Sequence, residues 1–102
     1  MHRASDEIEQ ADWLDALREA AAGLDLSTEA RSCAVDLFLA GVPEADRSKA
    51  PAVAASLYAA SLISGEERSQ AAVADAVGVS RLAVQDRWKD RLAEAGFEPP
   101  DW

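Results

Sequence analysis

The sequence has 102 residues, the size of one domain, and 49% of them are apolar, which is enough for one buried core. Asp and Glu number 19 against 10 Lys and Arg, so the formal net charge is −9, which counts against nucleic-acid binding because that usually needs a basic stripe. The N-terminus is acidic and lacks an apolar run, so no signal peptide or membrane span is expected, and the protein is expected in the cytoplasm.

Residues 1–5 are predicted to form a flexible tail, and residues 6–96 a single helical domain. The first helix of this domain is predicted to begin at Asp6, where the helix dipole favours negative charge, and to end near Gly23. Apolar residues recur along it at steps of three and four, as in an amphipathic helix: Ile8, Ala11, Leu14, Leu17, Ala21 and Leu24.

A second helix is predicted from Thr28 to Ala40, after a turn that holds several residues able to cap it. Gly41 and Pro43 end this helix, and the main loop of the chain continues to residue 47. The apolar side of the helix, which is expected to face the core, consists of Ala30, Cys33, Ala34, Leu37 and Phe38.

The third helix, from Ser48 to Gly65, is expected to be the centre of the core. Ser48 is its predicted cap, and Pro51 is placed in its first turn, where a missing N–H is tolerated. Between Ala52 and Ile63 the helix carries no charge and is apolar or small on every side, which is typical of a helix buried all round. It is too short to span a bilayer, which needs about 20 residues.

Residues 69–95 predict a helix-turn-helix. Ser69 caps a helix over 70–77, Gly78 ends it, and Ser80 caps a fifth helix that runs to about Ala95. The small side chain of Ala74 lets the two helices touch, and the other packing positions are Val73, Val77, Val79, Val84, Trp88 and Leu92. A helical corner with no role in DNA binding is the alternative interpretation.

Residues 97–102 form a tail in which two prolines exclude a helix. Its aromatic side chains are expected to fold back on the domain, with contact to a partner as the alternative. No stretch alternates like a strand, so the predicted fold is all-α with five helices.

If the motif binds DNA, the N-terminal half of its second helix enters a major groove. With Val84 facing inward, Gln85 can pair with adenine, and Leu82 can touch a thymine methyl group. Asp86 also faces outward and lowers DNA affinity unless it accepts from cytosine, while Arg91 is expected to pair with a neighbouring carboxylate. The nucleic-acid-binding residues predicted in this way are Ser69, Gln70, Ser80, Arg81, Leu82, Gln85, Arg87 and Lys89.

The sequence gives little support to metal, redox or catalytic chemistry. A single Cys33 and a single His2 cannot form a disulfide, a zinc site or a Cys–His nucleophile pair, and Cys33 is expected to be a small core residue. No cofactor, metal site or catalytic residue is therefore predicted, and the protein is not expected to be an enzyme.

The acidic, Ala-rich and Lys-poor composition suggests a protein kept soluble at high salt, as in extreme halophiles. An ordinary acidic protein is the alternative. At molar salt the screening length is about 3 Å, so local contacts decide whether DNA binds and the net charge counts less.

Residues 47–92 resemble the cyclin-like repeat of archaeal transcription factor B and eukaryotic transcription factor IIB. That repeat has five helices, an Ala-rich central helix with an AASLY-type segment, a charged turn and a helix-turn-helix that ends in an Arg, an aromatic residue and a Lys. The matching positions here are Arg47, Ala54 to Tyr58, Arg68, Val73, Ala74, Val79, Val84 and Arg87 to Lys89.

The resemblance implies binding to promoter DNA beside the TATA element and contact with TATA-binding protein. Family members usually have two such repeats after a zinc ribbon, whereas this sequence has one repeat and lacks the cysteines of a ribbon. Gln85 also replaces an expected basic residue. A stand-alone, DNA-binding transcription regulator of a haloarchaeon is expected, and a homodimer could imitate the arrangement of two repeats. The alternative is a protein-interaction module that binds TATA-binding protein or full-length transcription factor B and modulates initiation without DNA.

Overall fold

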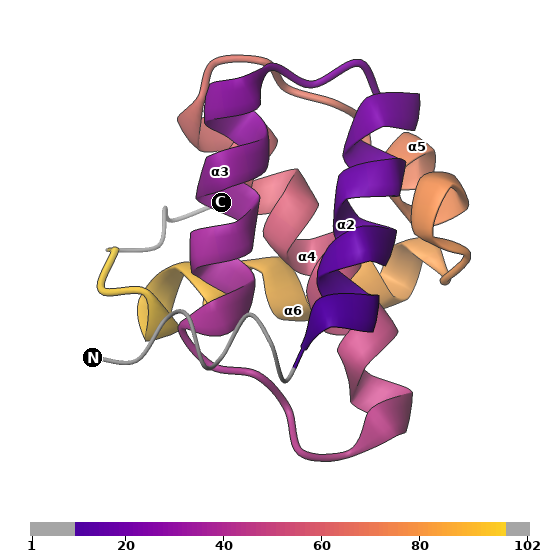
Figure 1. The fold of residues 1–102 in the computed structure, drawn as a ribbon, viewed down its shortest axis with the longest axis vertical. Helices are drawn as coiled ribbons and strands as arrows, with labels where there is room; N and C mark the ends of the chain where they lie inside the picture. Colours follow the sequence, from indigo (N-terminus) through magenta and orange to yellow (C-terminus); the bar gives the residue numbers. More distant parts are fainter. Residues whose placement is uncertain (1–9, 98–102) are drawn as a thin grey trace.

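The computed structural model describes residues 10–97 and consists of α-helices, with no strand in that range (Figure 1). Three predictions concern residues outside this range: the tail of residues 1–5, the helix start at Asp6 and the packing of Trp102. The all-α prediction is confirmed, and the described helices are α2 (Ala11–Gly23), α3 (Thr28–Leu39), α4 (Asp46–Ile63), α5 (Gln70–Val77) and α6 (Arg81–Glu94).

Helix α4 is the centre of the fold, as predicted. It contacts each of the other described helices, and Figure 1 shows it lying among them. Every residue from Ala52 to Ser61 is buried, because this stretch is apolar or small on all of its sides. The alanines of this stretch allow close approach of the neighbouring backbones, and α6 and α3 have the most extensive contacts with it.

The start of α4 differs from the prediction. The helix begins at Asp46, and Ser48 lies within its first turn instead of capping it. Asp46 is favoured at this end by the helix dipole, and residues 44–47 are exposed, so water can satisfy the first N–H groups without a side-chain cap. Pro51 is therefore in the second turn, where the carbonyl group that it leaves unbonded belongs to the exposed Arg47.

The predicted caps of the last two helices are confirmed. Ser69 Oγ accepts from the N–H of Ala72 at 3.0 Å, and Ser80 Oγ accepts from the N–H of Ala83 at 3.2 Å. Ser27 caps α3 in the same way, accepting from the N–H of Ala30 at 3.2 Å. Because each cap satisfies one of the free N–H groups at a helix start, these serines fix where α3, α5 and α6 begin.

The charged link after α4 ties two turns of the fold together. Glu66 accepts hydrogen bonds from the backbone N–H of Ser27, at 2.9 Å, and from its hydroxyl group. Arg68 donates from Nε to the carbonyl oxygen of Leu24 at 2.8 Å, and from its guanidinium group to that of Asp25 at 3.1 Å. The α2–α3 turn is thereby held against the segment that leads into α5.

This link makes the stability of the fold depend on pH. The hydrogen bonds from Ser27, assisted by Arg68, hold the pKa of Glu66 below its usual value of 4.5. A depressed pKa means that the stabilisation is present above the unfolded-state pKa and is lost as the pH falls through the folded-state pKa. We expect Glu66→Gln to lower the melting temperature at pH 7 and to lose less stability than the wild type as the pH falls below about 5.

The measurement is thermal unfolding followed by circular dichroism between pH 7 and pH 3. Glu67→Gln is the matched control, because it removes the same charge from the neighbouring, exposed position. Parallel pH profiles for Glu66→Gln and the wild type would contradict the assignment of the effect to Glu66.

Candidate nucleic-acid interface

Helices α5 and α6 meet through a three-residue turn, residues 78–80. Gly78 has φ +89°, in the left-handed region that favours glycine, and its N–H and that of Val79 donate to the carbonyl oxygen of Ala74 at 2.8 and 3.0 Å. Val73, Ala74 and Val84 are buried where the two helices touch, as predicted. Val77 and Val79 are partly buried against the core, so the turn itself is only partly covered.

The buried side of α6 is the predicted one. Val84, Trp88 and Leu92 face the core, and the Trp88 ring lies edge-on to Tyr58 of α4 with 5.3 Å between ring centroids. Arg91 is also buried: its guanidinium group donates to the carbonyl oxygen of Gly41 at 2.7 Å and lies 2.8 Å from the Glu94 carboxylate. The prediction that Arg91 pairs with a carboxylate is thus confirmed.

The outer side of α6 carries most of the predicted contact residues. Leu82 is 61% exposed, and Ser80, Arg81, Gln85 and Asp86 are exposed as well. Arg81, Gln85 and Lys89 are four residues apart and therefore form one row along the helix. Lys89 is less exposed than predicted, since its Nζ atom lies 5.7 Å from the centroid of the Trp88 ring.

The start of α5 joins this row through side-chain hydrogen bonds. Gln70 donates from Nε2 to Oε1 of Gln85 at 2.6 Å, and Arg81 donates to Oε1 of Gln70 at 3.4 Å. Ser69 stands beside Gln70 as the cap of α5, and its hydroxyl proton is not used by the cap hydrogen bond. The structure therefore brings together Ser69, Gln70, Arg81 and Gln85 at one corner of the molecule.

Arg87 is separated from this group. It is partly buried and lines a cavity of about 240 Å³ with Pro43 and Ser48, on the flank of α6 that faces the start of α4. The sequence pattern could not place Arg87 relative to the α3–α4 loop, because periodicity gives the direction of a side chain and not the position of other segments. The amide pair of Gln70 and Gln85 has no sequence signal either.

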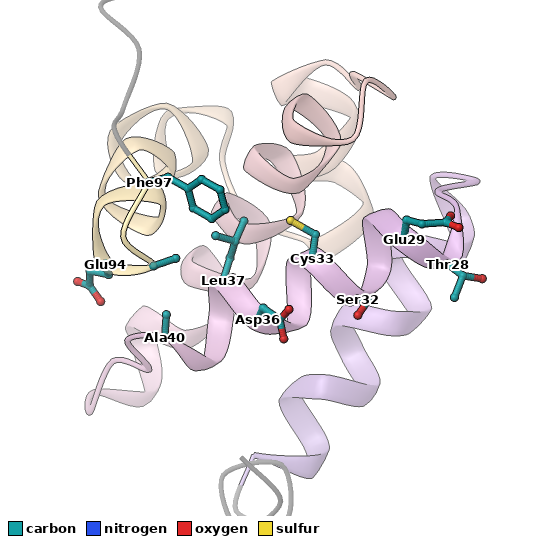
Figure 2. Close-up of a pocket in the computed structure, with 10 residues that line it drawn as sticks. Thr28, Glu29, Ser32, Cys33, Asp36, Leu37, Ala40, Glu94 and Phe97 are labelled. Atoms are coloured by element: carbon teal, nitrogen blue, oxygen red, sulfur yellow. The ribbon is translucent and has the colours of Figure 1, made fainter. Parts of the chain in front are cut away.

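A groove of about 760 Å³, the α3–α6 groove, lies between α3 and the end of α6 with the segment that follows it (Figure 2). Its apolar lining includes Cys33, Leu37 and Phe97, and Figure 2 shows the Phe97 ring facing Leu37. Phe97 thus folds back on the domain, as predicted for the tail, although it remains 47% exposed. Three carboxylates also line the groove: Glu29, Asp36 and Glu94.

Cys33 is in the wall of this groove, so its prediction as a core residue is corrected. It is partly buried and packs against the edge of the core. Partial burial, together with the nearby Asp36, raises the pKa of its thiol, so the thiol is protonated at neutral pH.

The part of the chain that the structure describes holds no cluster of His, Cys, Asp and Glu side chains fit to bind a metal ion. Within residues 10–97, none of the helices combines the length and apolar character that crossing a membrane requires. Two surfaces of the described residues are candidates for function: the outer side of α6 with the start of α5, and the α3–α6 groove.

Comparison with protein families identifies the fold. The family model described as "Transcription factor TFIIB repeat" matches residues 7–94, which is most of the chain. The chain belongs to the TFIIB repeat family. Its five described helices are accordingly the cyclin-like fold of that repeat, and the resemblance seen in the sequence is confirmed.

Relatives of the TFIIB repeat are archaeal proteins named transcription initiation factor IIB. The protein of Pyrococcus horikoshii is 41% identical over 54 residues, which are 53% of this chain and 18% of the relative. The protein of Methanosarcina mazei is 34% identical over 79 residues, covering 74% of this chain and 23% of the relative. That of Archaeoglobus fulgidus is 34% identical over 80 residues, covering 76% and 24%.

The chain thus spans about a quarter or less of the length of these relatives. The relatives are transcription factors and not enzymes, in agreement with the sequence prediction. Membership of the family supports a role related to transcription initiation.

Proposed function

We propose that this TFIIB repeat is a DNA-binding transcription regulator. In this mode α6 enters the major groove of promoter DNA, and the start of α5 contacts the DNA phosphates. The observation that carries this proposal is the row of the exposed Arg81 and Gln85 and the half-buried Lys89, next to the capped N-terminus of α5. A helix presents its N-terminal residues to base edges in this way when a second helix crosses the backbone.

The side chains divide into two kinds of contact. Gln85 pairs with a base and Leu82 touches a thymine methyl group, so these two read sequence. Arg81 and Lys89 neutralise phosphates, the hydroxyl groups of Ser69 and Ser80 donate to phosphate oxygens, and the backbone N–H of Gln70 adds the positive end of the α5 dipole. Arg87 reaches the backbone only from the flank of α6, and its contribution is expected to be smaller.

The distribution of charge supports this orientation. Residues 64–97 carry five Lys and Arg against six Asp and Glu, whereas residues 10–63 carry four against eight. The end of the molecule with α5 and α6 is therefore the least acidic part, although Asp86 is exposed on it. Asp86 is compatible with binding where it accepts a hydrogen bond from cytosine N4.

The test is binding to promoter fragments across a range of KCl concentrations up to the molar range. Arg81→Ala with Lys89→Ala is expected to weaken binding at least tenfold and to reduce the slope of log K against log salt by about 2, one for each lost phosphate contact. Arg18→Ala with Arg31→Ala removes the same charge from α2 and α3 and is the matched control. Equal affinities and slopes for the two double variants would refute the proposal.

A protein partner is the second candidate function, and the α3–α6 groove favours it. An apolar floor lined by three carboxylates suits a partner segment with an apolar side chain flanked by Lys or Arg. TATA-binding protein and full-length transcription factor B are the partners that we propose for it, on the basis of the family. In this mode the TFIIB repeat modulates initiation without touching DNA.

Phe97→Ala is expected to lower retention of purified TATA-binding protein or transcription factor B on the immobilised, DNase-treated protein about tenfold. Ile63→Ala is the control, because Ile63 is a similarly exposed apolar residue at 44% and lies outside the groove. Retention that is the same for both variants would exclude the groove as the docking surface.

A further inference from the structure

Three side chains at the corner of α5 and α6 form a directed chain of hydrogen bonds. Arg81 donates to Gln70, and Gln70 donates to Gln85, so Arg81 and Gln85, which lie one turn apart on α6, are bridged by a residue of α5. All three lie on the surface, and Gln85 is exposed. Because hydrogen bonds at the surface contribute little to stability, this bridge is better explained by an effect on the orientation of its side chains.

We propose that Gln70 is a positioning residue for base recognition: it holds the amide of Gln85 in the orientation that pairs with adenine. This inference rests on the proposed entry of α6 into the major groove. It adds, to the adenine contact expected of Gln85, a residue of the neighbouring helix that determines this choice.

The orientation follows from the donors and acceptors along the chain. A guanidinium group only donates, so Arg81 draws the carbonyl oxygen of Gln70 toward itself. The amide nitrogen of Gln70 then faces α6 and donates to Oε1 of Gln85 at 2.6 Å. As a result, Gln85 keeps its two N–H donors and the second lone pair of Oε1 for a ligand, in a fixed arrangement.

That arrangement matches one base edge in the major groove. Adenine presents an acceptor, N7, beside a donor, the N6 amino group, and a glutamine amide satisfies both at once. Guanine presents two acceptors, N7 and O6, so Oε1 of Gln85 would face an acceptor and lose its hydrogen bond. Because the amide does not have to be ordered upon binding, the pair with adenine forms at a lower entropic cost than with a freely rotating side chain.

Two substitutions at Gln70 keep a long side chain and change only whether it donates a hydrogen bond to Gln85 or accepts one from it. In Gln70→Lys, residue 70 only donates, so Gln85 keeps its orientation. In Gln70→Glu, residue 70 only accepts, so it draws the amide nitrogen of Gln85 toward α5 and reverses the amide. Both residues are tolerated at the half-buried first position of a helix, and melting temperatures verify that each variant folds.

The experiment begins with wild-type protein and a library of randomised DNA duplexes at molar KCl, with the retained duplexes sequenced. Gln85→Ala identifies the position that Gln85 reads as the one where the base preference disappears. Affinities are then measured for four duplexes that differ only at that base pair. The wild type is expected to bind the adenine duplex about tenfold more tightly than the guanine duplex, as for a bidentate pair.

Gln70→Lys is expected to keep this ratio and Gln70→Glu to reduce it to within about twofold, while the overall affinity changes in both because of their charge. A ratio that Gln70→Glu leaves intact, or that Gln70→Lys abolishes, overturns the inference. So does wild-type binding in which Gln85→Ala alters no base preference. Failure of the wild type to retain any duplex contradicts the proposed DNA binding instead, so the two failures are distinguishable.

Discussion

Replacing Trp88 by Ala is expected to lower the free energy of unfolding by about 3–5 kcal/mol, the usual cost of removing a large aromatic side chain from a core. Trp88 is 2% exposed and joins α6 to α4 through its edge-on contact with Tyr58. Since a domain of this size has a total stability of about 5–15 kcal/mol, the variant should melt at least 10 °C below the wild type. Chemical and thermal denaturation followed by circular dichroism measure both quantities.

Trp88→Phe is the matched variant, because a smaller ring can still meet Tyr58 and leaves a smaller cavity. It should lose markedly less stability than Trp88→Ala. Lys89 also lies over this ring, at 5.7 Å from its centroid, so Trp88→Ala should weaken any DNA contact of Lys89 even at temperatures where the variant is folded. A loss of less than about 1 kcal/mol in Trp88→Ala would contradict the role of Trp88 in joining the helices.

The elements that the sequence predicts best are those set by local chemistry. The bounds of α5 follow from Ser69, which caps it, and from Gly78, which adopts the left-handed conformation after it. The predicted start of α4 is wrong because Ser48 is a good cap by type, whereas the helix begins at Asp46, whose charge the helix dipole favours and whose exposed end needs no side-chain cap. The preference of a residue type for capping therefore predicts a helix end correctly only where no other arrangement can satisfy the N–H groups of that end.

Contacts between distant segments could not be predicted. The hydrogen bond from Arg68 to Leu24 joins residues 44 apart, and the bonds from Ser27 to Glu66 join residues 39 apart. Helical periodicity gives no sign that the segment after α4 holds the α2–α3 turn. Such pairs arise from the packing angles of the helices, which depend on the whole core.

The candidate interface divides in the same way. Helical spacing correctly predicted the exposure of Leu82, Gln85 and Asp86, since each position is fixed relative to Val84. It did not foresee that Arg87 is partly buried on the flank of α6, because that depends on where the α3–α4 loop lies. The link from Gln70 to Gln85 depends likewise on the angle between α5 and α6, which the turn at Gly78 sets.

Replacing Arg91 by Met is expected to cost about 1.5–3 kcal/mol of unfolding free energy, the usual value for a hydrogen bond that involves a charged group. Arg91 is 6% exposed and ties the end of α6 to the loop after α3 by donating to the carbonyl oxygen of Gly41. Met keeps most of the apolar stem of the side chain, so the loss reports on the polar contacts. Denaturant unfolding measures this loss of unfolding free energy, provided that the m-value is the same in the variant and the wild type.

Glu94→Gln separates the two contacts of Arg91. The Glu94 side chain is 47% exposed, so water screens its attraction to Arg91 and the variant should lose less than about 1 kcal/mol. The larger loss in Arg91→Met then belongs to the part-buried hydrogen bond with the carbonyl oxygen of Gly41. Equal losses in the two variants would assign the stabilisation to the ion pair instead. If the loss belongs to the bond with Gly41, the end of α6 is held by the α3–α4 loop, and Arg91→Met should also weaken DNA binding without changing which base Gln85 reads.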